Sequence, residues 1–228
     1  RNGEHVRRPA ICNPRDDFPE PGVSVDGAAI VLRSGSYEGT PDSAHGPAVE
    51  ARHGALVVLE DCDMALAVES TAQGAFGSTG QRCTATSRAV VIDKVADEFV
   101  AKIVERAKSF QLGAGDAPKT DIGPSVDESQ FKTVLKYIEI GREDGAVLLC
   151  GGKRAEGDGL QNGWFVEPTV FDRVTTDMRI AQEEIFGPVL SVIRVRDFDE
   201  AMAVANDSDY GLSSSVFTND TNLVYRFV

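Results

Sequence analysis

The chain has 228 residues and a formal net charge of −13, from 23 basic and 36 acidic side chains. An acidic surface repels nucleic acid and anionic lipid, so this charge argues against nonspecific binding to either. Apolar residues make up 42% of the chain, yet it contains no run of about 18 of them that would span a bilayer. The composition indicates an ordinary globular protein with one large domain or two small ones.

Residues 1–48 differ in character from the rest. They are rich in Pro, Gly, Ser and Asp, and only the apolar run 28–32 resembles a strand. The basic start has no apolar segment behind it, which is not the pattern of a secretory signal. We expect a leader over 1–48 and a separate domain over 49–228.

From residue 49 onward, short apolar runs alternate with segments of helical periodicity. The apolar runs predict strands at 55–60, 89–93, 146–152, 189–195 and 212–218. The 3.6-residue spacing predicts helices over 62–76, after residue 93, from near Asp127, over 199–207 and at the end of the chain. Asp61 is placed to cap the first helix. Alternating strands and helices predict an α/β fold with a mostly parallel sheet flanked by helices.

The four cysteines are Cys12, Cys62, Cys83 and Cys150. They are far apart and lack the spacing of a metal site, so we expect reduced thiols, a cytoplasmic location and no bound metal. Cys62 and Cys150 fall at a helix start and a strand end, where a structural role is the simplest interpretation. Cys83 differs because it stands in a polar loop, FGSTGQRCTATSR, at residues 76–88.

The chemistry available to Cys83 follows from its neighbours. The thiolate is the nucleophilic form of cysteine, and Arg82 or peptide N–H groups in the loop would lower the pKa of the thiol. Gly77 and Gly80 allow the backbone to approach a ligand closely. The residues alone leave two readings open, a reactive thiol or a small buried apolar side chain.

The segment GAFGSTGQRCTATSR (74–88) resembles the catalytic loop of the NAD(P)-dependent aldehyde dehydrogenase superfamily, in which F-x-x-x-G-Q-x-C surrounds the nucleophile. Three more blocks are similar to the same family in the same order: IGPSVDESQFKTVLKYIEIG (122–141), GWFVEPTVF (163–171) and AQEEIFGPVLSV (181–192). The Thr-Ala-Thr after Cys83 resembles the bacterial 2-oxoglutarate semialdehyde group. The chain is identified as a member of this superfamily, and the resemblance leads us to expect a catalytic-domain fragment truncated at both ends.

The resemblance implies a reaction and a set of roles. Cys83 would attack an aldehyde to give a thiohemiacetal, hydride would pass to NAD or NADP, and water would hydrolyse the thioester to a carboxylic acid. The backbone N–H of Cys83 would be one oxyanion donor. Glu184 would bind the ribose on the nicotinamide side with Phe186 near the ring, and Gln130 lies where the family has a residue near the adenine-side ribose. Members of the family assemble as homo-oligomers.

Each of these residues also has a simpler interpretation, in which it plays no part in catalysis or cofactor binding. Glu183 and Glu184 are typical of surface acids, and Phe186 before Gly-Pro is typical of core at a turn. Gln130 would simply face solvent on an amphipathic helix. Arg82 would pair with an acid instead of acting on the thiol.

The chain departs from the family just before the strand at 55–60. Members carry E-L-G-G-K there, and its Glu is the general base that activates water. This chain has AVEARHGALVV (48–58), and counting without gaps places Val49 at the base position. Glu50 is the candidate base if the alignment takes a one-residue gap. Residues 1–48 resemble nothing in the family's nucleotide-binding domain.

Two other functions stay open. The altered segment before the strand suggests a non-enzymatic fragment or pseudoenzyme that keeps the fold without the nucleotide. A cofactor-free thiol hydrolase or esterase would need a His partner for Cys83. All three histidines, His5, His45 and His53, lie in or beside the unmatched leader. We expect an aldehyde as small-molecule partner, and neither nucleic acid nor a membrane.

Overall fold

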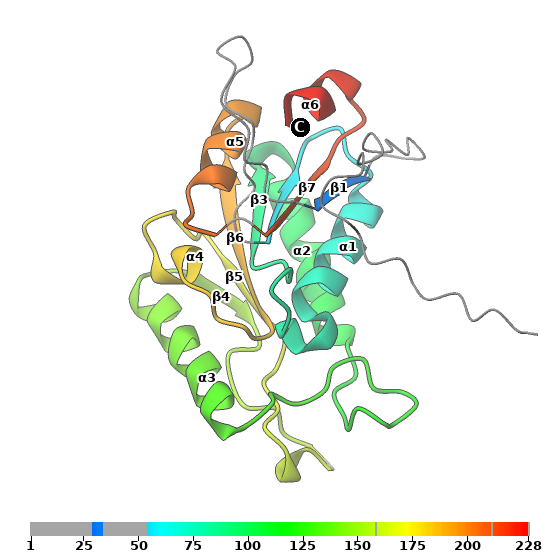
Figure 1. Cartoon of the computed structure of the whole chain (residues 1–228), viewed down its shortest axis with the longest axis vertical. Helices are drawn as coiled ribbons and strands as arrows, with labels where there is room; N and C mark the ends of the chain where they lie inside the picture. The colour runs from blue at the N-terminus through cyan, green and yellow to red at the C-terminus, as the bar shows by residue number, and fades with distance from the viewer. Residues whose placement is uncertain (1–28, 34–53, 158, 211, 228) are drawn as a thin grey trace, which may run out of the picture.

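A computed structural model describes residues 29–33, 54–157, 159–210 and 212–227 (Figure 1). The strands are β1 (Ala29–Arg33), β2 (Ala55–Val58), β3 (Arg88–Ile92), β4 (Val147–Cys150), β5 (Thr169–Asp172), β6 (Val189–Val195) and β7 (Ser213–Phe217). The helices are α1 (Met64–Phe76), α2 (Asp93–Ser109), α3 (Glu128–Glu143), α4 (Arg179–Gln182), α5 (Phe198–Asn206) and α6 (Thr221–Phe227), with 3₁₀ turns η1 (Gly77–Gly80) and η2 (Leu160–Asn162).

The seven described strands form one sheet in the order β1-β7-β2-β3-β6-β5-β4. The four central pairings, β7 with β2, β2 with β3, β3 with β6 and β6 with β5, are parallel. The two outer pairings, β1 with β7 and β4 with β5, are antiparallel. The predicted α/β fold with a mostly parallel sheet is confirmed.

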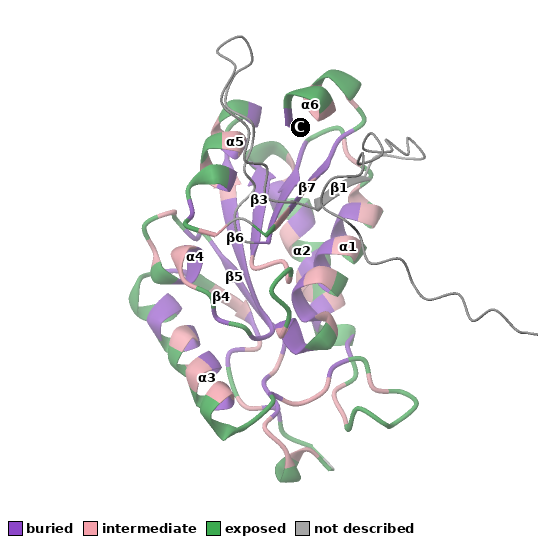
Figure 2. Cartoon of the chain, in the orientation of Figure 1, coloured by how far each residue is buried: buried purple, intermediate pink, exposed green. Residues whose placement is uncertain are grey.

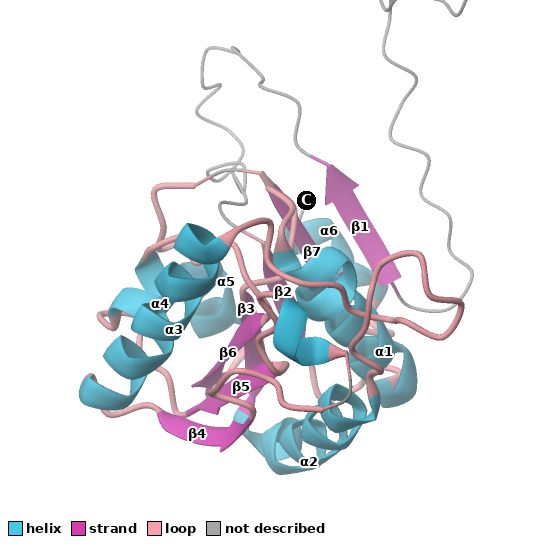
Figure 3. Cartoon of the chain, turned by 90° about the horizontal axis from the view of Figure 1, so that it is seen from below, coloured by secondary structure: helices cyan, strands magenta, loops and turns pink. Residues whose placement is uncertain are grey.

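Helices cover both faces of this sheet. Figure 3 shows α1 and α2 on one face and α3, α4 and α5 on the other. Alternate side chains of the central strands enter two hydrophobic cores: Val57 and Val90 belong to one, and Leu56 and Val91 to the other. Figure 2 shows these strands buried along their length, as expected for parallel strands between two helical layers.

A buried arginine fixes the start of β3. Arg88 is fully buried and donates to the carbonyls of Val204 and Ala205, each at 3.2 Å, at the end of α5. A cation is favoured at a helix C-terminus, where the last carbonyls lack helical partners. Burial lowers the pKa of Arg88 to about 10, an effect that nearby Asp207 opposes, so the side chain stays charged at neutral pH. The sequence pattern gave no sign of this contact.

The predicted cap of α1 is wrong. The Oδ1 atom of Asp63, not Asp61, accepts from the backbone N–H of Leu66 at 3.0 Å. An N-cap side chain reaches the amide two or three residues ahead, and the first helical residue is Met64. Asp61 instead accepts from the Thr218 hydroxyl at 2.8 Å and ties the end of β2 to the end of β7.

Several sequence-based expectations lie outside the described residues. Cys12, Glu50 and the three histidines all belong to segments 1–28 and 34–53. None of the described helices combines the length and apolar character that crossing a membrane requires.

Candidate active site

The loop that carries Cys83 lies at the amino end of the parallel strands. It leads from α1 into β3, while the segment 183–187, here called the glutamate loop, leads from α4 into β6. Because β3 and β6 are adjacent and parallel, the two loops meet at one edge of the sheet. Ligands of open α/β sheets usually bind at the carboxyl ends of the strands, so this site lies at the opposite edge.

The cysteine loop begins with a left-handed turn. Ser78, Thr79 and Gly80 have φ values of 53°, 60° and 65° in succession. Left-handed backbone costs a non-glycine residue roughly 1–2 kcal/mol, so other contacts must hold the turn in place. The hydroxyl of buried Thr79 does so by donating to the Gly123 carbonyl at 3.0 Å.

Gln81 attaches the cysteine loop to the turn before α3. Its Nε2 donates to the Pro124 carbonyl at 3.3 Å, and its Oε1 accepts from the Val126 N–H at 2.8 Å. The Gln of the G-Q-x-C pattern is therefore a link between two loops. Sequence reasoning assigned no role to Gln81 or Thr79; the available signal was a pair of polar side chains in a loop whose backbone groups need partners.

Two glycines let the cysteine loop pass close to other backbone. A Cβ on Gly80 would lie 2.1 Å from the Gly187 carbonyl oxygen, and a Cβ on Gly54 would lie 1.8 Å from that of Ala85. Neither position has room for any side chain. The loop is thus in direct backbone contact with the start of β2 and with the glutamate loop.

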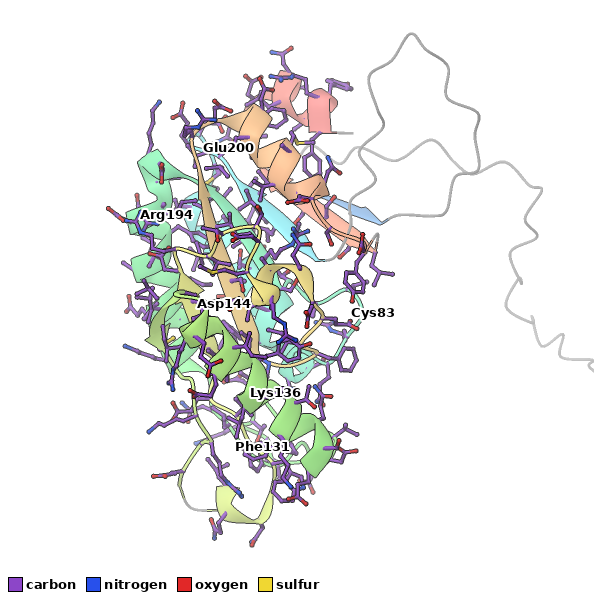
Figure 4. The ribbon with its side chains drawn as sticks, turned by 90° about the vertical axis from the view of Figure 1, so that its left-hand side faces the viewer. Cys83, Phe131, Lys136, Asp144, Arg194 and Glu200 are labelled. Atoms are coloured by element: carbon purple, nitrogen blue, oxygen red, sulfur yellow. The ribbon has the colours of Figure 1, made fainter. Side chains whose placement is uncertain are left out.

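The thiol of Cys83 is exposed, which contradicts the reading of this residue as a small buried apolar side chain. Cys83 lies at the margin of the fold (Figure 4). It borders an open hollow whose lining includes Arg82, Glu184, Ile185 and Phe186. The structure therefore brings three predicted site residues, Cys83, Glu184 and Phe186, to one place.

The two adjacent glutamates of the glutamate loop have different surroundings. Glu183 accepts from Arg179 at 2.9 and 2.8 Å and from the Tyr137 hydroxyl at 2.6 Å. These bonds, with those from Arg179 the larger contribution, lower the pKa of Glu183 to about 2. Glu184 is exposed and has no hydrogen-bond or ion-pair partner among the described residues. Only Glu184 is available to a ligand.

Phe186 and Gln130 meet at the glutamate loop. Phe186 is 38% exposed and has a φ of 55°, which is rare for a bulky residue. The Nε2 of Gln130 donates to the carbonyls of Ile185 at 2.9 Å and Phe186 at 3.0 Å. Partly buried Gln130 thus binds the glutamate loop, and its contact with a ribose stays a prediction.

The other described cysteines are poorly placed for chemistry. Burial, reinforced by the neighbouring charge of Asp61, raises the pKa of half-buried Cys62 to about 11. Burial also raises the pKa of Cys150, which lies in the core. Both observations agree with the structural interpretation of these two residues.

We expect iodoacetamide to label Cys83 well before Cys62 or Cys150. Cys83 is exposed, whereas a rise from an ordinary pKa of 9.0 to about 11 cuts the thiolate fraction of Cys62 at pH 8 by about 100-fold. Because the thiolate reacts, labelling of Cys62 should rise about tenfold per pH unit up to its pKa. Peptide mapping by mass spectrometry over time measures both rates, and equal labelling of Cys62 and Cys83 at pH 8 would contradict the assignment.

Comparison with known proteins agrees with this geometry. The aldehyde dehydrogenase family pattern matches residues 52–228. The chain is 51% identical over 172 residues to an alpha-ketoglutarate semialdehyde dehydrogenase of Haloferax volcanii, covering 75% of this chain and 35% of that protein. It is 48% identical over 167 residues to human retinal dehydrogenase 2, covering 73% of this chain and 31% of that protein.

Solved structures show the same relationship. A betaine aldehyde dehydrogenase of Staphylococcus aureus, solved in complex with NAD+, superposes with a TM-score of 0.76 at 36% identity, over 78% of this chain and 36% of that one. HpcC from Thermus thermophilus gives a TM-score of 0.75 at 40% identity, over 78% of this chain and 35% of that one. The chain thus spans about a third of the length of such relatives. With sequence pattern, fold and site in agreement, the chain belongs to the aldehyde dehydrogenase family.

Proposed function

We propose that the protein oxidises an aldehyde to a carboxylic acid with NAD or NADP, through a covalent intermediate on Cys83. The observation that carries this proposal is the shared hollow, where the exposed Cys83 thiol lies together with Glu184 and Phe186. The four sequence blocks and the family membership support it. Relatives of similar identity are named for alpha-ketoglutarate semialdehyde and for retinal.

The residues around the hollow fit the nicotinamide half of a dinucleotide. The exposed Glu184 carboxylate offers two acceptor oxygens to the vicinal hydroxyls of a ribose. The partly exposed Phe186 ring offers an apolar surface for a flat base. Gly80 and Gly187 are in backbone contact at the same hollow, which keeps the cysteine loop and the glutamate loop side by side.

In this mechanism the Cys83 thiolate attacks the carbonyl carbon of the aldehyde. The backbone N–H of Cys83 stabilises the oxyanion that forms. Glu184 and Phe186 would hold the nicotinamide half of the dinucleotide, which would supply the acceptor for the hydride that leaves the substrate carbon. Cys83 then holds the acyl group as a thioester until water releases the acid, and Glu50 is the candidate base for that water. The same proposal treats residues 49–228 as a catalytic domain that follows a leader over 1–48. It also includes a cytoplasmic location, and assembly as a homo-oligomer for full-length members of the family.

We expect Glu184→Gln to weaken dinucleotide binding by roughly tenfold to 100-fold, because a hydrogen bond to a charged acceptor contributes about 1.5–3 kcal/mol. Calorimetric titration of the chain with NAD+ and with NADP+ measures this change. Glu156→Gln removes an exposed carboxylate outside the hollow and should leave the affinity unchanged.

Two results would count against the proposal. Unchanged affinity in Glu184→Gln would remove Glu184 from the binding site. A chain that binds neither dinucleotide would favour the alternative of a non-enzymatic fragment.

A further inference from the structure

We propose that α3 positions the glutamate loop through one stripe of side chains, Gln130, Val134 and Tyr137, and thereby sets where Glu184 and Phe186 point. This inference rests on the proposed function, in which those two residues receive the nucleotide. The three residues are spaced i, i+4 and i+7, so they share one face of the helix. Figure 4 shows α3, which carries the labelled Phe131 and Lys136.

Gln130 controls the backbone of Phe186. Its own position is fixed, because its N–H donates to Oδ1 of the N-cap Asp127 at 2.8 Å. Its side-chain amide donates to the carbonyls of Ile185 and Phe186. These carbonyls belong to the peptide groups on either side of the Phe186 Cα, and the orientations of those groups define φ and ψ of Phe186. One amide therefore holds this residue in its left-handed conformation.

Val134 supports the end of the glutamate loop. The side chain is fully buried, and a Cβ on Gly187 would lie 2.4 Å from its Cγ2. The backbone at Gly187 thus rests directly on α3. This contact limits movement of the loop toward the helix, while the contact between Gly187 and Gly80 limits movement toward the cysteine loop.

Tyr137 anchors the start of the glutamate loop. Its hydroxyl donates to Glu183 at 2.6 Å, and the Arg179 guanidinium lies 5.6 Å from the centre of its ring while also binding Glu183. The loop is therefore held at Glu183, at the two carbonyls bound by Gln130, and at Gly187. The side chains of Glu184 and Phe186, which line the hollow, are then carried by a loop whose backbone is held on both sides of them.

The test combines loop mobility with nucleotide affinity in the full 228-residue chain. Gln130→Met keeps the length of the side chain but removes both donated hydrogen bonds, and Gln130→Glu places a carboxylate against two carbonyl oxygens. We expect the amide order parameters of Phe186 and Gly187 to fall in both variants from about 0.85 to below about 0.6, values typical of rigid and flexible backbone. NAD+ affinity should fall roughly tenfold, as expected when a preorganised contact is lost.

A matched control separates positioning from general destabilisation. Lys132→Met removes an exposed ion pair with Glu128 on the same helix and should change neither the order parameters nor the affinity. A glutamate loop that stays rigid in both Gln130 variants would overturn the inference, even if their affinity fell. A loop that becomes mobile in a chain whose wild type binds no dinucleotide would support the positioning role and reject the proposed function.

Discussion

Replacing Cys83 with serine is expected to reduce aldehyde-dependent formation of NADH or NADPH by roughly 10⁴-fold or more, the scale seen when a catalytic nucleophile is removed. A serine hydroxyl is hardly ionised near neutral pH, and the described residues that line the hollow include no histidine to activate it. Cys83 is exposed, so the substitution should leave the thermal unfolding temperature unchanged. Absorbance at the reduced nicotinamide band measures the rate.

The control for this experiment is Cys62→Ser, which changes a thiol of high pKa outside the hollow and should retain turnover. Full turnover by Cys83→Ser would refute the role of Cys83. The esterase alternative is examined in the same variants. Hydrolysis of an activated ester that depends on Cys83 and survives loss of His5, His45 and His53 would leave the dehydrogenase-type thiol as its explanation.

The fold could be predicted largely because its signals are local. The strand at 189–195 is confirmed to the residue, since Gly-Pro precedes the apolar run and charged residues follow it. The short helix α4 was not predicted, because four residues are too few to show a helical period. The cap of α1 was wrong because Asp61 and Asp63 are equally good caps by type, and the hydrogen bond to Leu66 decides between them.

The site could be predicted only in part, because many of its contacts join residues that are far apart in the sequence. Cys83, Glu184 and Phe186 came from resemblance to a family, and the structure brings them to one hollow. Glu183 is bound by Arg179, four residues before it, and by Tyr137, which is 46 residues away in the sequence, whereas Glu184 has neither contact. The partners of Gln130 and Gln81 are equally distant. The contacts of Tyr137, Gln130 and Gln81 depend on tertiary packing, so no local sequence pattern predicts them.

Replacing Gly80 with alanine is expected to lower the free energy of unfolding by about 3 kcal/mol. Its φ of 65° is left-handed, and its Cβ would lie 2.1 Å from the Gly187 carbonyl oxygen, so the backbone must shift. Gly145→Ala introduces a Cβ at a positive φ of 96° with no atom within 4 Å, which isolates the backbone strain. Gly115→Ala adds neither strain nor collision and should be nearly neutral. Urea unfolding of the three variants measures these costs.

The difference between Gly80→Ala and Gly145→Ala reports the contact between the two loops of the site. Because Gly80 touches Gly187, the added methyl group must push the cysteine loop away from the glutamate loop. Cys83 and Glu184 would then no longer border one hollow, so Gly80→Ala should also lose dinucleotide affinity, whereas Gly145→Ala should keep it. Suppose instead that Gly80→Ala and Gly145→Ala lower the free energy of unfolding equally and both keep the dinucleotide affinity of the wild type. The backbone contact at Gly80 would then not hold the site together.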